Sequence, residues 1–549
     1  MAAALRDAVL CVLPFVALAC SAGGNSETLV RRAPADEEVA AAGGAGGESG
    51  ADDPEPPPEP PGVVTHDGPL RFGESWGRAW GGNGRCQTLK VAVASDGTAH
   101  VSGWFERTVD FDPGEGVDER SVEEGTAIFL SRYSPEGEYL STLTWSTQPG
   151  STSNVVENMS ATLALSEAGD IYLAGRFSGS VDFDPGPAHD VRQAPDPTRG
   201  DGFVTKLAPS DDYRWTVTLG GTGSQRRAFG DVAPTGDAVY ATAQYTGEPA
   251  PSLGLPPATP GPEGFGATAD CGLVALDLEG NPLWAASWGN LDAEYSCDVA
   301  ADAEHVVVAS YATARFALTP SGLYDELDPG SVYGPTAVLY DPTGTRRWVR
   351  VWGSSGSPTD LVEAIALRGS AIYVGGTLSG GDGDFGLPSA PDIHSLRGLY
   401  DGYLFSLDMD GNARWVGTWG GAGARARTLG VATDDDRVVA VGSFAGAVDF
   451  GPGAAYDTDS RRAPFVTAFD HDGNHLWARI AQGTGHNVAR SVALHDGSAF
   501  VSGIFWDDID LAFGDAPADV WSSPSLYACF VARFPAKGAD AESAEESTR

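Results

Sequence analysis

Short apolar segments alternate with turns rich in Gly, Asp and Asn along most of the chain. Within a segment, large apolar residues alternate with small or polar ones, and β-branched and aromatic residues are frequent, which predicts β-strands. One group of four strands comprises Leu89–Ala94, Ala99–Phe105, Ala127–Tyr133 and a strand ending at Trp145. Turns such as Asp277–Asn281 separate third and fourth strands, because Asp and Gly supply the positive φ that tight hairpins need.

A tryptophan phrase, Trp-x-x-x-Trp-Gly, recurs once in each four-stranded group. Its second position falls at residues 80, 145, 219, 288, 352, 419 and 481, with Leu219 and Ala481 in place of tryptophan in two copies. Seven copies at a nearly constant spacing predict seven repeated units. Four strands per unit and seven units predict an all-β fold, a seven-bladed β-propeller. Recurrence at one strand position favours packing between blades over a sugar-binding ladder of tryptophans.

The two ends of the repeated region complement each other. The last unit ends after Tyr527–Phe534 without its tryptophan strand, whereas Glu74–Gly82 is an additional copy at the front. We therefore expect the N-terminal strand to complete the last blade, which closes the ring and covers its open edge. The predicted propeller occupies residues 69–537.

The first twenty residues indicate export. Arg6 precedes an apolar run, Ala8–Ala19, that is too short to span a bilayer and is typical of a secretory signal. The stretch from Ala17 to Cys20 resembles a bacterial lipobox, which implies that residues 1–20 are a lipoprotein signal peptide and that Cys20 is acylated. By the same resemblance, Ser21 does not signal inner-membrane retention. The alternative is an ordinary signal peptide, cut near Ala19, of a secreted protein.

Polar segments flank the predicted propeller. Residues 21–68 consist largely of Gly, Ala, Glu and Pro, and residues 538–549 are similarly poor in apolar side chains. Such segments bury too little surface to offset the entropy of ordering. We expect a disordered tether before the propeller and a disordered acidic tail after it. The localisation that follows is the cell envelope, as an outer-membrane lipoprotein that is periplasmic or surface-exposed.

The charge balance restricts the classes of partner that the protein can bind. Asp and Glu number 75 against 34 Lys and Arg, a formal net charge of −41 for 549 residues. A nucleic-acid-binding protein needs a basic surface, so nucleic acid is excluded as a partner. Anionic lipid is repelled as well, which leaves the lipid anchor as the contact with the membrane. The predicted propeller itself holds 60 acidic and 30 basic residues, so the imbalance belongs to the ring. We expect a monomer.

Several phrases resemble a known bacterial repeat. Trp419–Gly421, Asp96–Gly103 and Asp201–Lys206 resemble the SBBP-type repeats, seven-bladed β-propeller repeats of bacterial secreted proteins. The variant Val109–Gly114 is similar to that of repeat lipoproteins from myxobacteria and related Gram-negative bacteria. The resemblance covers about Leu70 to Lys537. It implies an exported propeller and no particular catalytic residues.

The phrase Asp-Phe-Asp-Pro-Gly is the first candidate for chemistry. It occurs at Asp110–Gly114 and Asp182–Gly186, and weaker forms follow later in the chain. Paired carboxylates are hard oxygen ligands suited to Ca²⁺, so Asp110, Asp112, Asp182 and Asp184 are calcium candidates. The favoured interpretation is a turn in which Asp accepts backbone N–H groups and Pro-Gly fixes the bend, with the phenylalanine packed between blades.

Four cysteines lie within the predicted propeller. Cys271 begins a third strand and Cys297 begins the next blade, while Cys529 and Cys86 stand in the same relation after closure. In an exported protein these analogous pairs predict the disulfides Cys271–Cys297 and Cys86–Cys529. Four buried thiols are the alternative.

No enzyme signature is found in the sequence: no nucleophile elbow, HExxH or P-loop. Binding candidates are instead the loops in which the repeat varies, because a rigid scaffold presents function on its loops. These loops are Thr246–Ala269, Thr313–Gly334 and Ser379–Tyr400. Near the ends of the expected central channel, arginines face acids that they could neutralise, or together hold an anion: Arg226, Arg227, Arg425, Arg427 and Arg490, with Glu157, Glu294 and Glu363.

Three functions are compatible with these observations. The favoured one is a non-catalytic binding module that takes a protein, peptide or glycan ligand on its loop face. The first alternative is an extracellular enzyme, a lyase or hydrolase with a site in the central channel. The second is a purely structural envelope lipoprotein.

Overall fold

The computed structural model describes the repeated region and a short segment before it. Cys20, the predicted signal peptide, most of the predicted tether and the predicted tail lie outside the described residues. No helix within the described part of the chain is long and apolar enough to cross a membrane. The described residues are 64–66, 68–148, 159–195, 200–219, 227–246, 269–288, 295–313, 333–354, 360–386, 390–458, 461–514 and 517–536.

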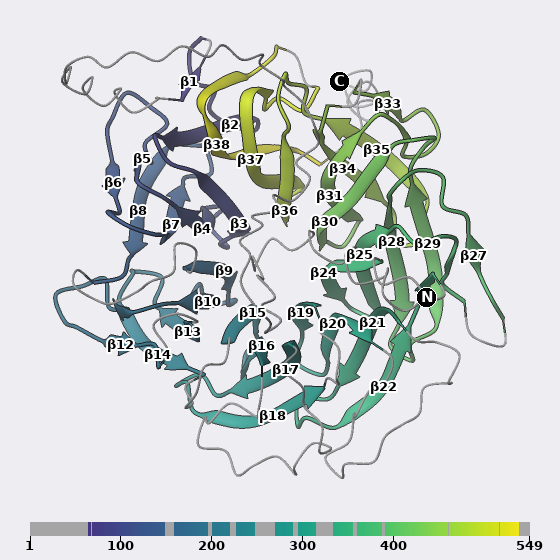
Figure 1. The fold of residues 1–549 in the computed structure, drawn as a ribbon, viewed down its shortest axis with the longest axis horizontal. Coiled ribbons are helices and arrows are strands. Elements are labelled where there is room, and N and C mark those ends of the chain that lie inside the picture. The colour runs from purple at the N-terminus through teal and green to yellow at the C-terminus, as the bar shows by residue number, and fades with distance from the viewer. Residues whose placement is uncertain are drawn as a thin grey trace, which may run out of the picture. The chain divides into compact units, whose positions relative to one another are not determined.

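The described chain is all-β and is built from four-stranded antiparallel units (Figure 1). Sheet 1 comprises β3 (Cys86–Val93), β4 (Ala99–Phe105), β7 (Ala127–Tyr133) and β8 (Tyr139–Trp145). Sheet 2 comprises β9 (Ser160–Leu165), β10 (Ile171–Phe177), β13 (Asp201–Leu207) and β14 (Tyr213–Thr218). Sheet 3 comprises β15 (Arg227–Pro234), β16 (Val239–Thr246), β17 (Ala269–Leu276) and β18 (Pro282–Trp288). Sheet 4 comprises β19 (Tyr295–Ala301), β20 (Val306–Thr313), β21 (Tyr333–Tyr340) and β22 (Arg346–Val351). Sheet 5 comprises β24 (Leu361–Arg368), β25 (Ala371–Leu378), β28 (Asp401–Asp408) and β29 (Ala413–Trp419). Sheet 6 comprises β30 (Arg425–Thr433), β31 (Val438–Ala445), β34 (Ala463–Phe469) and β35 (His475–Ile480).

Sheet 7 combines the end of the repeated region with its beginning. Its strand order is β36 (Val488–His495), β37 (Ser498–Asp510), β38 (Val520–Pro535) and then β2 (Trp76–Gly82). Trp76 pairs with Arg533 and Trp80 with Cys529, and every residue of β2 is buried. The strand that precedes sheet 1 in the sequence therefore lies at the outer edge of sheet 7.

Two residues of the predicted tether belong to a strand. The short strand β1 (Thr65–His66), assigned above to the tether, pairs with Ser522 and Trp521 of β38. His66 also bonds to Asp519 at 2.7 Å and lies against the Trp521 ring. These contacts hold two residues that their polar sequence surroundings alone assign to a disordered segment.

Successive sheets pack against one another through their first strands. In Figure 1 the first strands β3, β9, β15, β19, β24, β30 and β36 lie around the middle of the view, and the fourth strands lie at its periphery. Each first strand contacts the next in chain order, and β36 contacts β3. Apolar clusters fill the space between neighbouring sheets; one joins Trp76 and Trp80 of sheet 7 to Phe129 and Tyr133 of sheet 1. The predicted packing role of the tryptophans is confirmed by this placement.

At five junctions the first tryptophan of the phrase lies over the hairpin turn of the following sheet. Its indole N–H donates to a turn carbonyl at 2.7–3.0 Å at five junctions. A glycine with positive φ stands beneath each ring, and a Cβ on it would approach the ring to 2.6–3.1 Å. The five pairs are Trp76 with Gly137, Trp215 with Gly280, Trp284 with Gly344, Trp348 with Gly411, and Trp415 with Gly473.

One junction lacks both members of this pair. Ser141 occupies the tryptophan position of sheet 1, since it pairs with Arg132 as Trp215 pairs with Lys206 in sheet 2. The turn that follows in sheet 2 has Asp211 at the glycine position, with φ of 72°. Arg132 forms an ion pair with Asp211 across this junction. Glycine is therefore present where a tryptophan ring covers the turn and absent where none does.

Candidate functional site

Most first strands carry a β-bulge near their middle. The register shifts between Thr88 and Lys90 in β3, and β15, β19, β24, β30 and β36 shift at similar positions. A bulge adds one residue to a strand and redirects its side chain. Charged residues lie at or beside these bulges, namely Lys90, Asp231, Asp298, Glu363 and Arg490. We call these five residues, together with Arg427 of β30, the axial cluster.

One part of the axial cluster joins sheets 1, 2 and 3. Lys90 Nζ lies 3.4 Å from both carboxylate oxygens of Asp231. The Thr162 hydroxyl of β9 donates to Asp231 Oδ1 at 3.2 Å. Asp231 is buried, whereas the Lys90 side chain keeps 38% of its surface accessible, so solvent reaches one side of the pair.

The electrostatics of this part are coupled to Asp298 of β19. Burial lowers the pKa of Lys90, but Asp231 and Asp298 oppose burial, and the net pKa is raised. Burial and the Asp231 carboxylate raise the pKa of Asp298 to about 7, although Lys90 opposes them. Asp298 therefore changes its charge near neutral pH, as groups that transfer protons do.

The other part joins sheets 5, 6 and 7. Arg427 forms an ion pair with Glu363, whose second oxygen accepts the Thr377 hydroxyl at 3.1 Å. Arg490 makes no hydrogen bond or ion pair with the described residues, and its Nε is buried without a partner. Burial and the neighbouring Arg427 charge lower the pKa of Arg490 to about 10.

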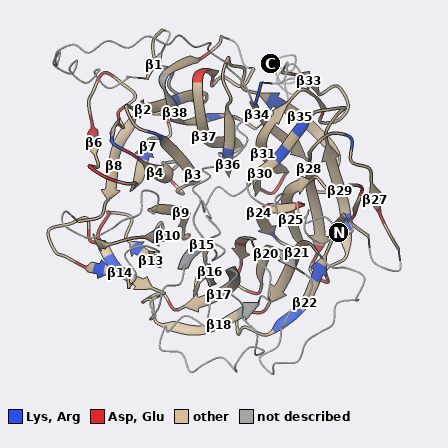
Figure 2. Cartoon of the chain, viewed as in Figure 1, with Lys and Arg blue, Asp and Glu red and all other residues tan. Residues whose placement is uncertain are grey.

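The sequence interpretation named some of these residues and missed others. Arg427 and Glu363 neutralise each other, one of the two alternatives left open above. Arg226, Glu157 and Glu294 lie outside the described residues, and so does the side chain of Arg227. Lys90, Asp231 and Asp298 were missed. A usable signal was present, because each is a charged residue inside an otherwise apolar strand, and the chain holds three lysines in all. Figure 2 shows other basic residues on fourth strands such as β14, β22 and β35.

The Asp-Phe-Asp-Pro-Gly phrases form small hairpins. They are β5 (Thr108–Asp110) with β6 (Glu119–Ser121), and β11 (Ser180–Asp182) with β12 (Val191–Gln193). Asp110 Oδ1 accepts the N–H groups of Asp112 at 3.2 Å and Asp118 at 2.9 Å. Asp182 makes the equivalent bonds to Asp184 and Asp190, at 3.2 and 2.9 Å. Asp112 and Asp184 accept N–H groups of Gly114 and Gly186, at 2.8 and 2.7 Å.

These hairpins also attach one sheet to the one before it. Asp110 pairs with Gly81 of β2, and Val181 bridges to Thr147. Weaker copies behave alike: β32 (Ala447–Asp449) with β33 (Ala455–Asp457) bridges to Gly420, and β26 (Gly383–Asp384) with β27 (Ile393–His394) pairs with β23 (Gly353–Ser354). Phe111 packs on Phe105 and Phe129. Among the described residues, no group of three or more His, Cys, Asp or Glu is arranged to hold a metal. The observed contacts are those of the turn interpretation.

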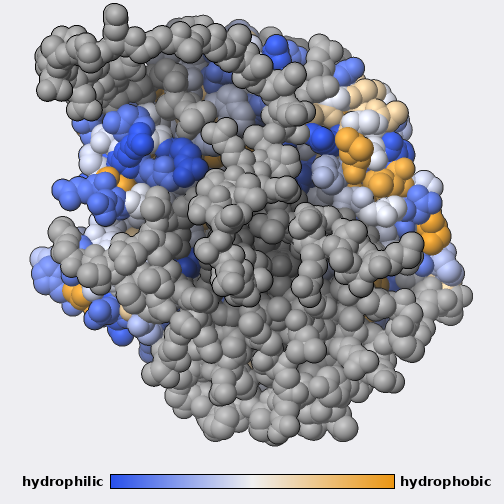
Figure 3. All heavy atoms as spheres, in the orientation of Figure 1, coloured by the Kyte–Doolittle hydropathy of each residue, from blue (hydrophilic) through white to orange (hydrophobic). Residues whose placement is uncertain are grey.

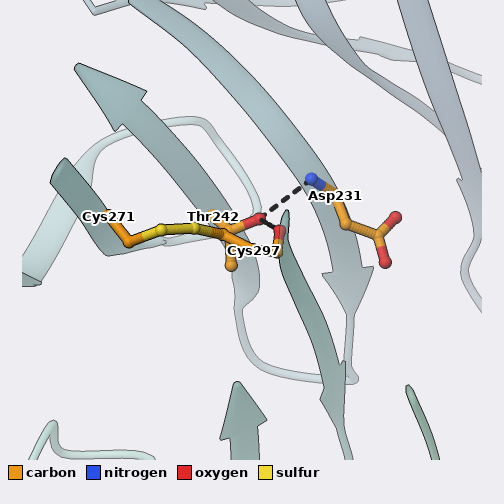
Figure 4. Close-up of a disulfide and its surroundings, with 4 residues drawn as sticks. All are labelled: Asp231, Thr242, Cys271 and Cys297. Atoms are coloured by element: carbon orange, nitrogen blue, oxygen red, sulfur yellow. Dashed lines mark hydrogen bonds between the residues drawn. A yellow bond between two sulfur atoms is a disulfide. The ribbon is translucent and has the colours of Figure 1, made fainter. Parts of the chain in front are cut away.

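Two disulfides join neighbouring sheets. Cys86 of β3 is bonded to Cys529 of β38, and Cys271 of β17 to Cys297 of β19, with Cα–Cα distances of 5.5 and 6.4 Å. Cys86 lies inside the first strand, which begins earlier than the Leu89 expected from the sequence, with Leu89 at the bulge. Figure 4 shows Thr242 beside the second disulfide; its hydroxyl accepts Asp231 N–H at 2.9 Å and donates to the Cys297 carbonyl.

The three variable loops predicted to bind a ligand lie partly outside the described residues. The interiors of Thr246–Ala269 and Thr313–Gly334 lie outside the described residues. Ser379–Tyr400 is described except for residues 387–389, and it contains the β26–β27 hairpin. On the face shown in Figure 3, the hydrophobic residues among those described form small groups separated by hydrophilic ones.

Comparisons with known proteins reveal distant likenesses. No protein-family model matches the chain. The uncharacterized WD repeat-containing protein L264 of Acanthamoeba polyphaga mimivirus is 22% identical, with 84% of this chain matched to 37% of that protein. The chain thus spans about a third of its curated relative.

Matches to solved structures are distant in sequence and have low TM-scores. The polysaccharide lyase Uly1 matches 82% of this chain and 90% of its own at 10% identity and a TM-score of 0.38. The endosialidase of phage phi92 matches 87% and 70% at 11% identity and 0.35, and an apocarotenoid oxygenase of Synechocystis matches 82% and 93% at 10% and 0.35. The chain's own repeated four-stranded sheets define a β-propeller-like repeat protein.

Proposed function

We propose that this protein is an exported, lipid-anchored β-propeller of seven blades, closed by β2, which binds a protein, peptide or glycan ligand through its loop face. The two disulfides carry the export part of the proposal. Each joins neighbouring sheets, and structural disulfides of this kind persist in oxidising compartments outside the cytoplasm. The pairing of β2 with β38 and the contact of β36 with β3 support a closed ring.

The proposed location is the outer membrane or the cell surface, where acylated Cys20 would anchor the protein. The test is expression of the full chain in a Gram-negative host supplied with labelled palmitate. We expect the label on the parent protein, in the membrane fraction, and none on a Cys20→Ser variant. An unlabelled, soluble parent protein would favour the alternative of a secreted protein.

Ligand binding is tested separately from the location of the protein. The purified protein is applied to arrays of peptides and glycans, with calcium and with a chelator. Saturable binding to one class of probe supports the binding module. Failure to bind any class, together with envelope defects on deletion, would favour the purely structural alternative.

A catalytic role is the second candidate, because Asp298 has a pKa of about 7 beside Lys90 and Asp231. Such an environment suits an acid–base group of an extracellular lyase or hydrolase. Release of new reducing ends or unsaturated sugars from acidic polysaccharides, abolished in an Asp298→Asn variant, would favour the enzyme over the binding module.

A further inference from the structure

Two arginines approach each other on neighbouring first strands at the centre of an acidic protein. Arg427 belongs to β30 and Arg490 to β36, and these strands pack together. The backbones are close at this point, since a Cβ on Gly430 would lie 2.9 Å from the Arg490 carbonyl oxygen. The Arg427 charge is among the causes that lower the pKa of Arg490. The packing therefore keeps two like charges together.

The nearby charges do not balance these arginines. Glu363 forms an ion pair with Arg427 and accepts a hydrogen bond from Thr377. The Nε atoms of Arg427 and Arg490 are both buried without a hydrogen-bond partner among the described residues. Among the described residues, one carboxylate, that of Glu363, thus faces the two guanidinium groups of Arg427 and Arg490, in a chain whose net charge is −41.

Such an arrangement is costly unless an anion completes it. A partly buried charge without a partner loses part of its hydration and gains nothing in return, and each unsatisfied buried donor adds to the cost. Guanidinium groups are planar forks of N–H donors that match the oxygens of carboxylate, sulfate and phosphate groups. The Arg427 side chain keeps 24% of its surface accessible, so a small ligand can reach the pair.

The opposite part of the axial cluster restricts where an anion can bind. Asp231 and Asp298 lie around Lys90, with two carboxylates for one ammonium group. An incoming anion is repelled there and attracted towards β30 and β36. The cluster is thus divided by charge, with its cationic part on sheets 6 and 7.

We propose that Arg427 and Arg490 form a binding site for a small oxyanion, either free or as the carboxylate or sulfate group of a larger ligand. The site goes beyond the loop-face function proposed above and does not depend on it. The test uses the full chain with sodium sulfate and sodium acetate as probes, against sodium chloride at equal ionic strength. Binding is measured by titration calorimetry and by the shift in thermal midpoint.

We expect saturable binding of sulfate or acetate by the parent protein. Arg490→Gln should weaken it roughly 10- to 100-fold, the range for losing charge-assisted hydrogen bonds. Arg490→Lys retains the positive charge but lacks the forked N–H donors of a guanidinium group, so its affinity should lie between those of the parent and Arg490→Gln. Arg347→Gln is the matched control, because Arg347 is 60% exposed in an ion pair with Asp341 on a fourth strand; its affinity should equal that of the parent.

In chloride alone, Arg490→Gln should be at least as stable as the parent, because it removes an uncompensated charge. Equal midpoint shifts with chloride and with both probes would overturn the site and indicate general screening. Unchanged affinity in Arg490→Gln, or in Arg490→Lys should the first variant not fold, would overturn it as well. Sulfate binding without acetate binding would indicate a tetrahedral oxyanion, and the reverse a carboxylate.

Discussion

Replacing Gly473 by alanine tests how neighbouring sheets are held together. Gly473 has φ of +87°, and a Cβ there would stand 2.6 Å from the Trp415 ring. Positive φ costs an alanine about 1 kcal/mol. The ring must also move, which breaks the 2.9 Å bond from Trp415 to the His471 carbonyl, a further loss of about 1 kcal/mol, and disturbs its packing by a similar amount. We expect a total loss of about 2–4 kcal/mol.

A second glycine separates the backbone cost from the packing cost. Gly497 also has positive φ, +69°, but a Cβ there would meet no atom within 4 Å. Gly497→Ala should therefore cost only about 1 kcal/mol. Both variants are compared with the parent by urea unfolding at unchanged m-value, monitored by tryptophan fluorescence and circular dichroism.

The same comparison in a Trp415→Ser background completes the test. That background imitates the junction of Ser141 with Asp211, so Gly473→Ala should then cost about 1 kcal/mol, as at Gly497. Equal losses at Gly473 and Gly497 in the parent, or an undiminished loss at Gly473 once Trp415 is gone, would refute the ring-on-glycine explanation.

Three further predictions concern charge, crosslinks and the hairpins. Stability should fall as pH rises from about 4 to 7, because the folded pKa of Asp298, about 7, exceeds the ordinary 3.8 and the folded state releases its extra proton across that window. The shift in the pKa of Asp298 sets an upper limit of about 4 kcal/mol on this loss of stability, and partial solvent access reduces the loss to roughly 2 kcal/mol. The thermal midpoint of Asp298→Asn should vary less with pH than that of the parent. An unchanged slope would contradict the assignment. Removing Cys86–Cys529 should cost more than removing Cys271–Cys297, about 6 against 3.5 kcal/mol by loop closure over 443 and 26 residues, whereas equal midpoint shifts in the two double-alanine variants would exclude that explanation. Asp110→Ala should cost about 1–3 kcal/mol by leaving two N–H groups unbonded, equally with calcium and with a chelator; a loss confined to calcium buffer would instead favour a metal at this loop.

Strand positions could be predicted because their causes are local. Alternating side chains, turn residues and the recurring tryptophans mark each unit, and they located Ala99–Phe105 and Ala127–Tyr133 to the residue. The bulges could not be predicted in this way. They depend on the neighbouring first strands, so the sequence placed the start of β3 at Leu89 instead of Cys86.

The axial cluster was missed for a related reason. Lys90 is stabilised by Asp231, which is 141 residues away in the sequence, and His66 by Asp519, which is 453 residues away. Periodicity within a unit contains no information on such partners. It assigned His66 to a disordered tether and left Lys90 as an unremarked charge within a strand.

The pairing of β2 with β38 also determines when the molecule can finish folding. On the ribosome, Trp76 and Trp80 emerge before sheets 1 to 6, but their strand partner, Val520–Pro535, emerges after these sheets. Until then β2 has an unpaired edge and exposed aromatic rings, both of which favour aggregation. Sheets 1 to 6 can form in order as they appear, whereas sheet 7 must await β38. A nascent chain arrested before β38 would therefore carry β2 without its main strand partner.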